Sequence, residues 1–180
     1  MRLANSLTLL ERSAPRIAPL LKKWYVEYGV PMNRAIGLCL DEVAADSSRV
    51  VVRLPFRRRN LNVDGTVHGG VIAALAETVH GIAVLWQFSP AEHFMVSREL
   101  RVEFVAPGRG ALTVEFALEA SVRRQIEVAL AESGSCDVQF TSEVNDAEGK
   151  TVARLAGSYV IRRRRGADVS GRSSTRSKGR

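Results

Sequence analysis

The chain has 180 residues, of which 46% are hydrophobic, so its length suits one well-formed core and is short for two. The net charge of +7 belongs to the C-terminal end, because residues 162–180 hold eight Lys or Arg and a single acid while the preceding 161 residues are neutral. The tail arginines lack the interleaved aromatic residues of a nucleic-acid-binding motif, and we do not expect nucleic acid as a partner.

The N-terminal part is predicted to be helical. Apolar residues recur at helical spacing over residues 5–29, with Pro15 and Pro19 suited to helix starts and Gly29 to a helix end. We therefore assign residues 1–34 to an N-terminal helical extension. The segment has no continuous apolar core of a secretion signal, so we expect a cytoplasmic protein.

Two strands are predicted to follow the extension. Residues 35–45 and 48–55 flank an Asp46-Ser47 turn, and the second segment alternates apolar and polar residues. A basic run, Arg57-Arg58-Arg59, comes next.

Residues 62–86 are predicted to form a turn followed by a long buried helix. Turn-forming residues precede Thr66, which is suited to cap the helix, and the apolar residues that follow have a three- to four-residue period: Ile72, Leu75, Val79, Ile82 and Trp86. The segment is apolar on nearly every side and therefore belongs inside a domain. Glu77 and His80 interrupt it, so we do not expect a membrane span.

Two features depart from this apolar pattern. The pair Gly69-Gly70 lies in the first helical turn, where glycine weakens a helix but leaves backbone amides open to a ligand. Glu77 places a carboxylate in the middle of the buried segment, where an unpaired charge is costly. Open amides at the start of a helix together with a mid-helix carboxylate indicate a functional site.

Four further strands and one helix are predicted downstream. The strands cover residues 95–105, 111–119, 136–146 and 150–162, and helical spacing covers 120–131 with Gly134 as the stop. In the first strand we expect Val96, Leu100, Val102 and Phe104 on one face and Ser97, Arg101 and Glu103 on the other. Residues 163–180 are rich in Gly, Ser and Arg, and we expect a disordered basic tail. The predicted class is α+β, an antiparallel sheet curved around one long helix.

The segment NVDGTVHGGVIAALAE resembles the signature of hotdog-fold acyl-CoA thioesterases, the PaaI-like and 4-hydroxybenzoyl-CoA thioesterase superfamily. The pattern VSRELRVEFVAPGRG is similar to the strand that follows the helix in that family. The resemblance spans about residues 35–162 and implies a hotdog domain there. The N-terminal extension and the helix at 120–131 depart from the family pattern and weaken any inference about the substrate.

The resemblance implies roles for several residues. Glu77 matches the catalytic carboxylate and Gly69 the oxyanion amide, while Asn62 and His68 match residues that position the thioester and the water. Ser97 matches an auxiliary hydroxyl on the next strand, and we assign Gly70 to substrate binding.

The chemistry of thioester hydrolysis agrees with these roles. A helix N-terminus offers unsatisfied N–H groups where an oxyanion develops, and Glu77 can act as general base or as a nucleophile that forms an anhydride. Gly69 has a structural alternative, close packing at the start of the helix. For Glu77 the alternative is a polar residue satisfied by His80, a core histidine that we expect to pair with it.

The spacing of Gly69 and Glu77 indicates a site shared between subunits. Eight residues on one straight helix separate their backbones by about 12 Å, which exceeds the reach of one carbonyl and its attacking water. If both residues act on one substrate, Glu77 comes from a neighbouring chain, and we expect a homodimer, which could pair further into a tetramer.

The remaining candidates have strong structural alternatives. Asn62 before Asp-Gly is common turn chemistry, and His68 in a first helical turn is often a cap. The run of Arg57, Arg58 and Arg59 is suited to the phosphates of coenzyme A or to a solvated loop.

The leading hypothesis is hydrolysis of an acyl-CoA, or of an acyl carrier protein thioester, with coenzyme A entering only as part of the substrate and with no metal or other cofactor. The alternative is a non-catalytic acyl-CoA-binding or regulatory hotdog module. A hotdog hydratase is disfavoured, because the interval of nine from His68 to Glu77 does not fit the motifs of those enzymes.

Overall fold

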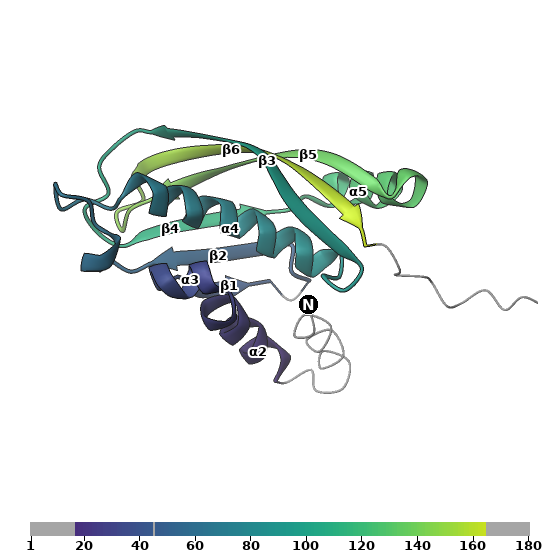
Figure 1. The fold of residues 1–180 in the computed structure, drawn as a ribbon, viewed down its shortest axis with the longest axis horizontal. Coiled ribbons are helices and arrows are strands. Elements are labelled where there is room, and N and C mark those ends of the chain that lie inside the picture. The colour runs from purple at the N-terminus through teal and green to yellow at the C-terminus, as the bar shows by residue number, and fades with distance from the viewer. Residues whose placement is uncertain (1–16, 45, 165–180) are drawn as a thin grey trace, which may run out of the picture.

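The computed structural model describes residues 17–44 and 46–164. Its sheet has six antiparallel strands in the order β1-β2-β4-β5-β6-β3, and it curves around the long helix α4 (Gly69–Gln87), as Figure 1 shows. The strands are β1 (Cys39–Val43), β2 (Arg49–Leu54), β3 (His93–Phe104), β4 (Leu112–Ala117), β5 (Ser135–Asn145) and β6 (Thr151–Arg163). The predicted α+β class, with an antiparallel sheet around one helix, is confirmed.

Helix α4 supplies the centre of the core. Leu75, Ala76, Val79, Ala83 and Val84 are completely buried against the concave face of the sheet. By length and composition, α4 is the one helix in the described part of the chain that could also cross a membrane, in spite of Glu77 and His80. Its buried residues serve the core of this fold.

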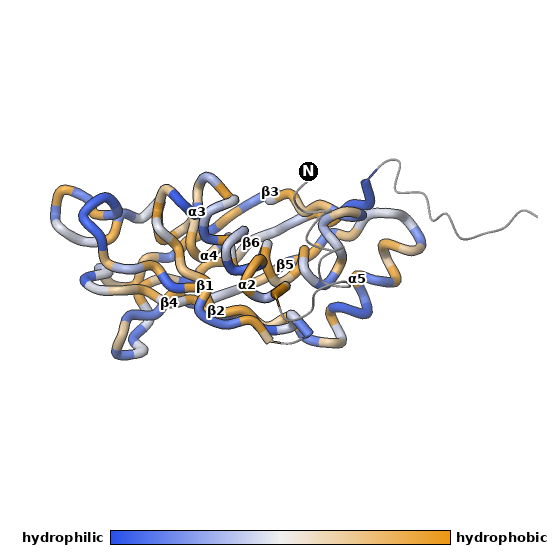
Figure 2. Tube along the Cα trace, turned by 90° about the horizontal axis from the view of Figure 1, so that it is seen from below, coloured by the Kyte–Doolittle hydropathy of each residue, from blue (hydrophilic) through white to orange (hydrophobic). Residues whose placement is uncertain are grey.

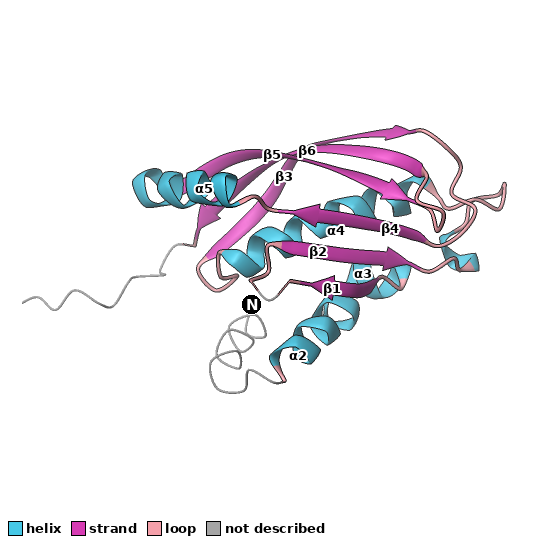
Figure 3. Cartoon of the chain, turned by 180° about the vertical axis from the view of Figure 1, so that it is seen from behind, coloured by secondary structure: helices cyan, strands magenta, loops and turns pink. Residues whose placement is uncertain are grey.

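The N-terminal region is helical as predicted but extends further along the chain. It consists of α2 (Ala18–Trp24), a π-helical turn η1 (Tyr25–Gly29) and α3 (Pro31–Ile36), which lie beside β1 at one edge of the sheet in Figure 3. The predicted end at Gly29 is confirmed for η1. The strand predicted from residue 35 is wrong over its first four residues, because Pro31 starts a further helix and Gly37, at φ 70°, caps it in the left-handed conformation. Residues 1–16 of the predicted extension lie outside the described residues.

A β-bulge divides β3 into two halves. Ser97 pairs with Tyr159 of β6 and Glu99 pairs with Ser158, so Arg98 is an extra residue without its own partner. The predicted alternation along this strand is therefore wrong in its first half. Met95 and Ser97 face α4 before the bulge, and Val102 and Phe104 do so after it.

The C-terminal half follows the prediction closely. Helix α5 (Ala120–Ser133) alternates polar and apolar residues along its length in Figure 2, buries Ile126 and Leu130, and ends at Gly134 in the left-handed conformation. Strand β6 continues to Arg163, one residue into the predicted tail. Residues 165–180 of that tail lie outside the described residues.

Candidate functional site

A cavity of about 450 Å³ lies between α4, the N-terminal helices and the start of β3. Most of its lining is apolar, with contributions from one strip of α4, from α2 and η1, and from the turn after α4. The lining residues are Lys22, Tyr25, Val26, Val30, Asn33, Glu77, Thr78, Gly81, Ile82, Leu85, Trp86, Gln87, Ser89, Pro90, Met95 and Ser97. We call this space the main cavity.

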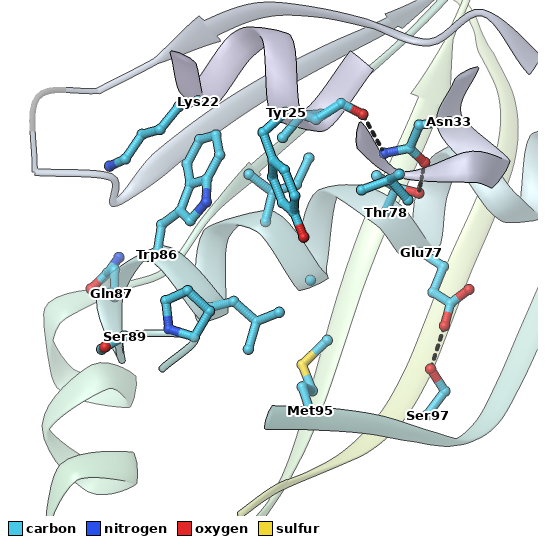
Figure 4. A pocket seen from close by; sticks show the side chains of 16 residues that line it. Lys22, Tyr25, Asn33, Glu77, Thr78, Trp86, Gln87, Ser89, Met95 and Ser97 are labelled. Atoms are coloured by element: carbon cyan, nitrogen blue, oxygen red, sulfur yellow. Dashed lines mark hydrogen bonds between the residues drawn. The ribbon is translucent and has the colours of Figure 1, made fainter. Parts of the chain in front are cut away.

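Glu77 is a half-buried acid at one end of the main cavity. Its Oε1 accepts a hydrogen bond from the Ser97 hydroxyl, as Figure 4 shows. Ser97 reaches the helix because the bulge at Arg98 places it on the concave face of the sheet, while Arg98 turns outward to an ion pair with Asp137 at 3.1 Å. The structure therefore brings together the predicted acid and the predicted hydroxyl.

A second polar contact fixes the wall opposite β3. The buried Asn33 amide donates to the Val26 carbonyl at 3.0 Å, and the Thr78 hydroxyl lies 3.4 Å from Asn33 Oδ1 (Figure 4). The Asn33 bond ties α3 to η1, and the Thr78 hydroxyl of α4, which donates to the Ala74 carbonyl at 2.8 Å, lies beside it. The N-terminal helices thus form one wall of the cavity.

His80 is a core histidine, as expected, but its predicted pairing with Glu77 is wrong. It is completely buried, and its Nδ1 lies 2.8 Å from the Tyr159 hydroxyl among the rings of Phe116 and Phe140. Burial lowers the pKa of His80 to about 4. Burial, with a smaller contribution from the charge of Glu77, raises the pKa of Tyr159 above its usual range. Both side chains are therefore neutral at pH 7.

The N-terminal end of α4 is capped by His68 and not by Thr66, which was the predicted cap. The ring Nδ1 of His68 accepts a hydrogen bond from the Gly70 amide at 3.0 Å. The Gly70 amide is therefore occupied, contrary to the prediction of two open amides. Among the described residues, no acceptor bonds the Gly69 amide.

Gly69 also has a packing role. A β-carbon at this position would lie 2.9 Å from the ring of Phe104, closer than such contacts occur in proteins. The structural alternative for Gly69, close packing at the start of the helix, therefore applies in this fold.

Gly69 and Glu77 line different cavities of the same chain. Gly69 borders a second space of about 370 Å³, lined by Asn62, Thr66, Val67, Ile72, Phe104, Val105, Ala106, Pro107 and Gly108. None of these residues lines the main cavity. Both glycine and acid lie on the continuous helix α4, eight residues and about 12 Å apart along its axis. One chain does not bring them together.

Asn62 organises the turn before α4. Its Oδ1 accepts from the amides of Asp64 and Thr66, and its Nδ2 donates to the Thr66 hydroxyl at 2.9 Å. These contacts match the alternative interpretation of Asn62 as a turn residue. Asn62 also lines the second cavity together with Gly69.

The three arginines do not reach either of these two cavities. The guanidinium ends of Arg57 and Arg59 meet above Gly37, each 2.5 Å from the place where a β-carbon of that glycine would lie. All three side chains, including that of Arg58, are exposed. Their loop is tied to the start of α4, because the His68 amide donates to the Asn60 carbonyl at 2.8 Å.

Sequence reasoning missed the residues that shape the main cavity. Tyr25 comes from the π-helical turn, and Gly29 gives its ring room, since a β-carbon there would lie 2.7 Å from the ring. Trp86 was recognised as apolar but not as a wall of a cavity. One signal was present in the sequence: Gly81 lies inside the long helix, where glycine needs a packing or functional reason.

Comparisons with known proteins agree with this fold. Residues 20–161 match the family described as "Domain of unknown function (DUF4442)". The chain is 28% identical over 118 residues to a Saccharolobus solfataricus protein named "Putative esterase SSO2140", which covers 66% of this chain and 75% of that protein.

Superposition on solved structures identifies the fold. A Pseudomonas aeruginosa protein, PA5026, described as a probable thioesterase, superposes with a TM-score of 0.75 at 26% identity, covering 81% of this chain and 96% of that one. The thioesterase HI1161 of Haemophilus influenzae has the same fold, with a TM-score of 0.56 at 16% identity over 72% of this chain and 81% of that one. The predicted hotdog fold and the resemblance to the thioesterase superfamily are confirmed.

Proposed function

The chain belongs to the family of domains of unknown function DUF4442, and we propose that it hydrolyses acyl-CoA thioesters to a free acid and coenzyme A. Its relatives support a thioesterase-type hydrolysis at the level of the family. The observation that carries the finer proposal is the position of Glu77, a half-buried acid oriented by Ser97 at the end of an apolar cavity.

In the proposed reaction Glu77 is the general base. Its carboxylate takes a proton from a water molecule as the water oxygen attacks the thioester carbon. The Gly69 amide donates to the carbonyl oxygen as negative charge develops there. The C–S bond then breaks, and the coenzyme A thiolate receives the proton held by Glu77. Ser97 is a positioning residue, because it holds the carboxylate and need not touch the substrate.

We assign the Gly69 amide to a second protomer. Glu77 and Gly69 border separate cavities of one chain, and β3 offers a surface for a partner. It is an edge strand of twelve residues that, among the described residues, pairs only with β6, and it exposes Val96, Leu100 and Phe104 by 47%, 39% and 56%. The backbone N–H and C=O groups of an unpaired strand edge can pair with another strand, and a second copy would also cover these three apolar side chains, which lie among exposed charged residues. In such a homodimer the two α4 helices would run side by side.

The loop arginines have a place in the same proposal. Arg57 and Arg59 converge at Gly37, from a loop that the His68–Asn60 backbone bond ties to the start of α4, and guanidinium groups bind phosphate well. We assign Arg57, Arg58 and Arg59 to the phosphates of coenzyme A, and His68 and Asn62 to the frame that holds the Gly69 amide in place.

A thiol-release assay over short, medium, long and aromatic acyl-CoAs tests the function. Glu77→Gln preserves the size of the side chain and its bond with Ser97 but removes the base, so turnover should fall by a factor of about 10² to 10⁴. Undiminished hydrolysis by the Gln variant would remove Glu77 from its role. Absence of hydrolysis by the wild type, with acyl-CoA still bound, would favour a non-catalytic binding module.

A further inference from the structure

The main cavity follows one strip of α4 away from Glu77. Residues of α4 that line it recur every four positions, as Glu77, Gly81 and Leu85, and beside them as Thr78, Ile82 and Trp86. This spacing keeps side chains on one face of a helix. The cavity is therefore a channel alongside the helix, with the acid at one end and the ring of Trp86 near the other.

Gly81 keeps the middle of this channel open. Apart from the adjacent residues and the backbone of the helix itself, the terminal methyl of Met95, at 3.8 Å, is the only heavy atom of the described residues within 4 Å of a β-carbon placed at Gly81. Glycine inside a helix weakens it relative to alanine, so packing does not explain this residue. Its effect is to leave space beside the helix, four residues beyond Glu77.

The N-terminal helices close the channel from the side. Tyr25 and Val26 of η1 and Val30 face it, and Figure 4 shows the rings of Tyr25 and Trp86 among the side chains that line the cavity. The π-helical turn and Gly29 place the Tyr25 ring there. The amide of Asn33, the most buried polar group of this wall, bonds to the Val26 carbonyl and lies near the Thr78 hydroxyl.

On the basis of the proposed function, we infer that Gly81, Tyr25 and Trp86 determine specificity for an unbranched apolar acyl chain of about ten carbons. From Glu77 to Trp86 the helix advances by about 13 Å. An extended carbon chain with bonds of about 1.5 Å advances by about 1.25 Å per bond, so about ten bonds span that distance. A volume of about 450 Å³ lies within the usual range for pockets that enclose a small ligand.

Two substitutions should move the chain-length preference in opposite directions. Gly81→Leu fills the channel about 6 Å beyond Glu77, so chains longer than about five carbons should lose at least tenfold in kcat/KM. Trp86→Ala opens the far end, so a fourteen-carbon chain should gain at least tenfold relative to a ten-carbon chain, since each further buried methylene is worth about fourfold.

Matched control variants distinguish an effect on the channel from a general loss of folding. Gly81→Ala adds a β-carbon at ordinary contact distance, so it should raise the unfolding midpoint and shift the chain-length preference in the same direction as Gly81→Leu, but less. Tyr25→Phe keeps the ring and removes the hydroxyl, so its chain-length profile should change less than that of Tyr25→Ala, which should broaden the profile.

The experiment measures kcat/KM for acyl-CoAs of four to sixteen carbons, and binding of S-alkyl-CoA thioethers of six, ten and fourteen carbons by calorimetry. Thioethers have no carbonyl and cannot be hydrolysed, so binding tests the channel independently of the reaction. If Gly81→Leu shortens the preferred acyl chain and Trp86→Ala lengthens it, the inference is established. Wild-type hydrolysis with a length profile that neither variant moves would overturn it and leave the proposed function standing. Thioether binding with the expected shifts, but without hydrolysis of any acyl-CoA, would overturn the proposed function and retain the channel.

Discussion

Two polar pairs connect α4 to the sheet, and they differ mainly in what surrounds them. His80 and Glu77 are three residues apart on the helix, and their partners Tyr159 and Ser97 face each other on adjacent strands. The His80–Tyr159 pair is sealed among aromatic rings, whereas the Glu77–Ser97 pair opens on the main cavity. The Glu77–Ser97 pair can therefore contact a substrate in the cavity, whereas the His80–Tyr159 pair can only stabilise the core.

The largest expected difference between the pairs is in activity. Glu77→Gln should lower turnover by a factor of about 10² to 10⁴ and leave the free energy of unfolding within about 0.5 kcal/mol of wild type. Turnover and chemical denaturation measured on the same preparation check the loss of activity and the unchanged stability. A Glu77→Gln variant that loses activity only because it unfolds would show that Glu77, too, is needed for stability.

The sealed pair should respond to pH through stability. Because the pKa of His80 is about 4 in the folded protein and about 6.5 in an unfolded chain, the unfolded chain binds more protons in acid. The contribution of neutral His80 to the free energy of unfolding is fully present above about pH 6.5. It is lost as the pH falls to about 4, which lowers the free energy of unfolding by about 3 kcal/mol in total. Chemical denaturation at a series of pH values measures how the free energy of unfolding changes with pH. The double variant His80→Leu, Tyr159→Phe should lack this pH dependence. An equal pH dependence in that variant would assign it to other titrating groups.

Removing one member of the sealed pair should cost stability. Tyr159→Phe leaves His80 Nδ1 buried without its partner, and we expect a loss of about 1–3 kcal/mol in the free energy of unfolding. Replacing both members by apolar residues should cost less than this single change. A Tyr159→Phe variant of wild-type stability would show that the hydrogen bond adds nothing to the fold.

The smallest expected effect concerns Ser97. Ser97→Ala should lower kcat by about tenfold, because the carboxylate of Glu77 loses its orienting bond, with KM nearly unchanged. Ser97→Thr retains a hydroxyl and should recover most of the activity. If Thr rescues nothing while both variants fold normally, Ser97 acts through the shape of the cavity instead.

The sequence predicted the parts of the fold that depend on repeated patterns. The period of α4, the alternation of β2 and β4, and Gly134 after α5 all follow from local propensity and burial. Helix α3 was missed because the apolar residues of 35–45 suit a strand equally well until the cap at Gly37 is seen.

The candidate site was harder to predict for a physical reason. An alternating pattern cannot show that one extra residue, Arg98, turns Ser97 from one face of the sheet to the other. Likewise the partners of His80 and Glu77 are set by which strands cross the helix, and the cap of α4 by the rotamer of His68. The walls formed by Tyr25 and Trp86 depend on contacts between segments about sixty residues apart.

Hybrid dimers give the most direct test of a site shared between protomers. One parent is Glu77→Gln. The other carries Gly69→Pro, which removes the backbone N–H at the first position of α4, where proline is tolerated, together with Phe104→Ala, which makes room for the added ring. Each parent should be nearly inactive, the Phe104→Ala control should remain active, and all should be dimers by size-exclusion chromatography.

Mixed by co-expression, the two parents should recover about a quarter of wild-type activity, because half of randomly paired dimers are mixed and each of those holds one complete site of two. Recovery at that level would show that Glu77 of one protomer acts with the Gly69 amide of the other. A mixture of stable dimers no more active than its parents would contradict it.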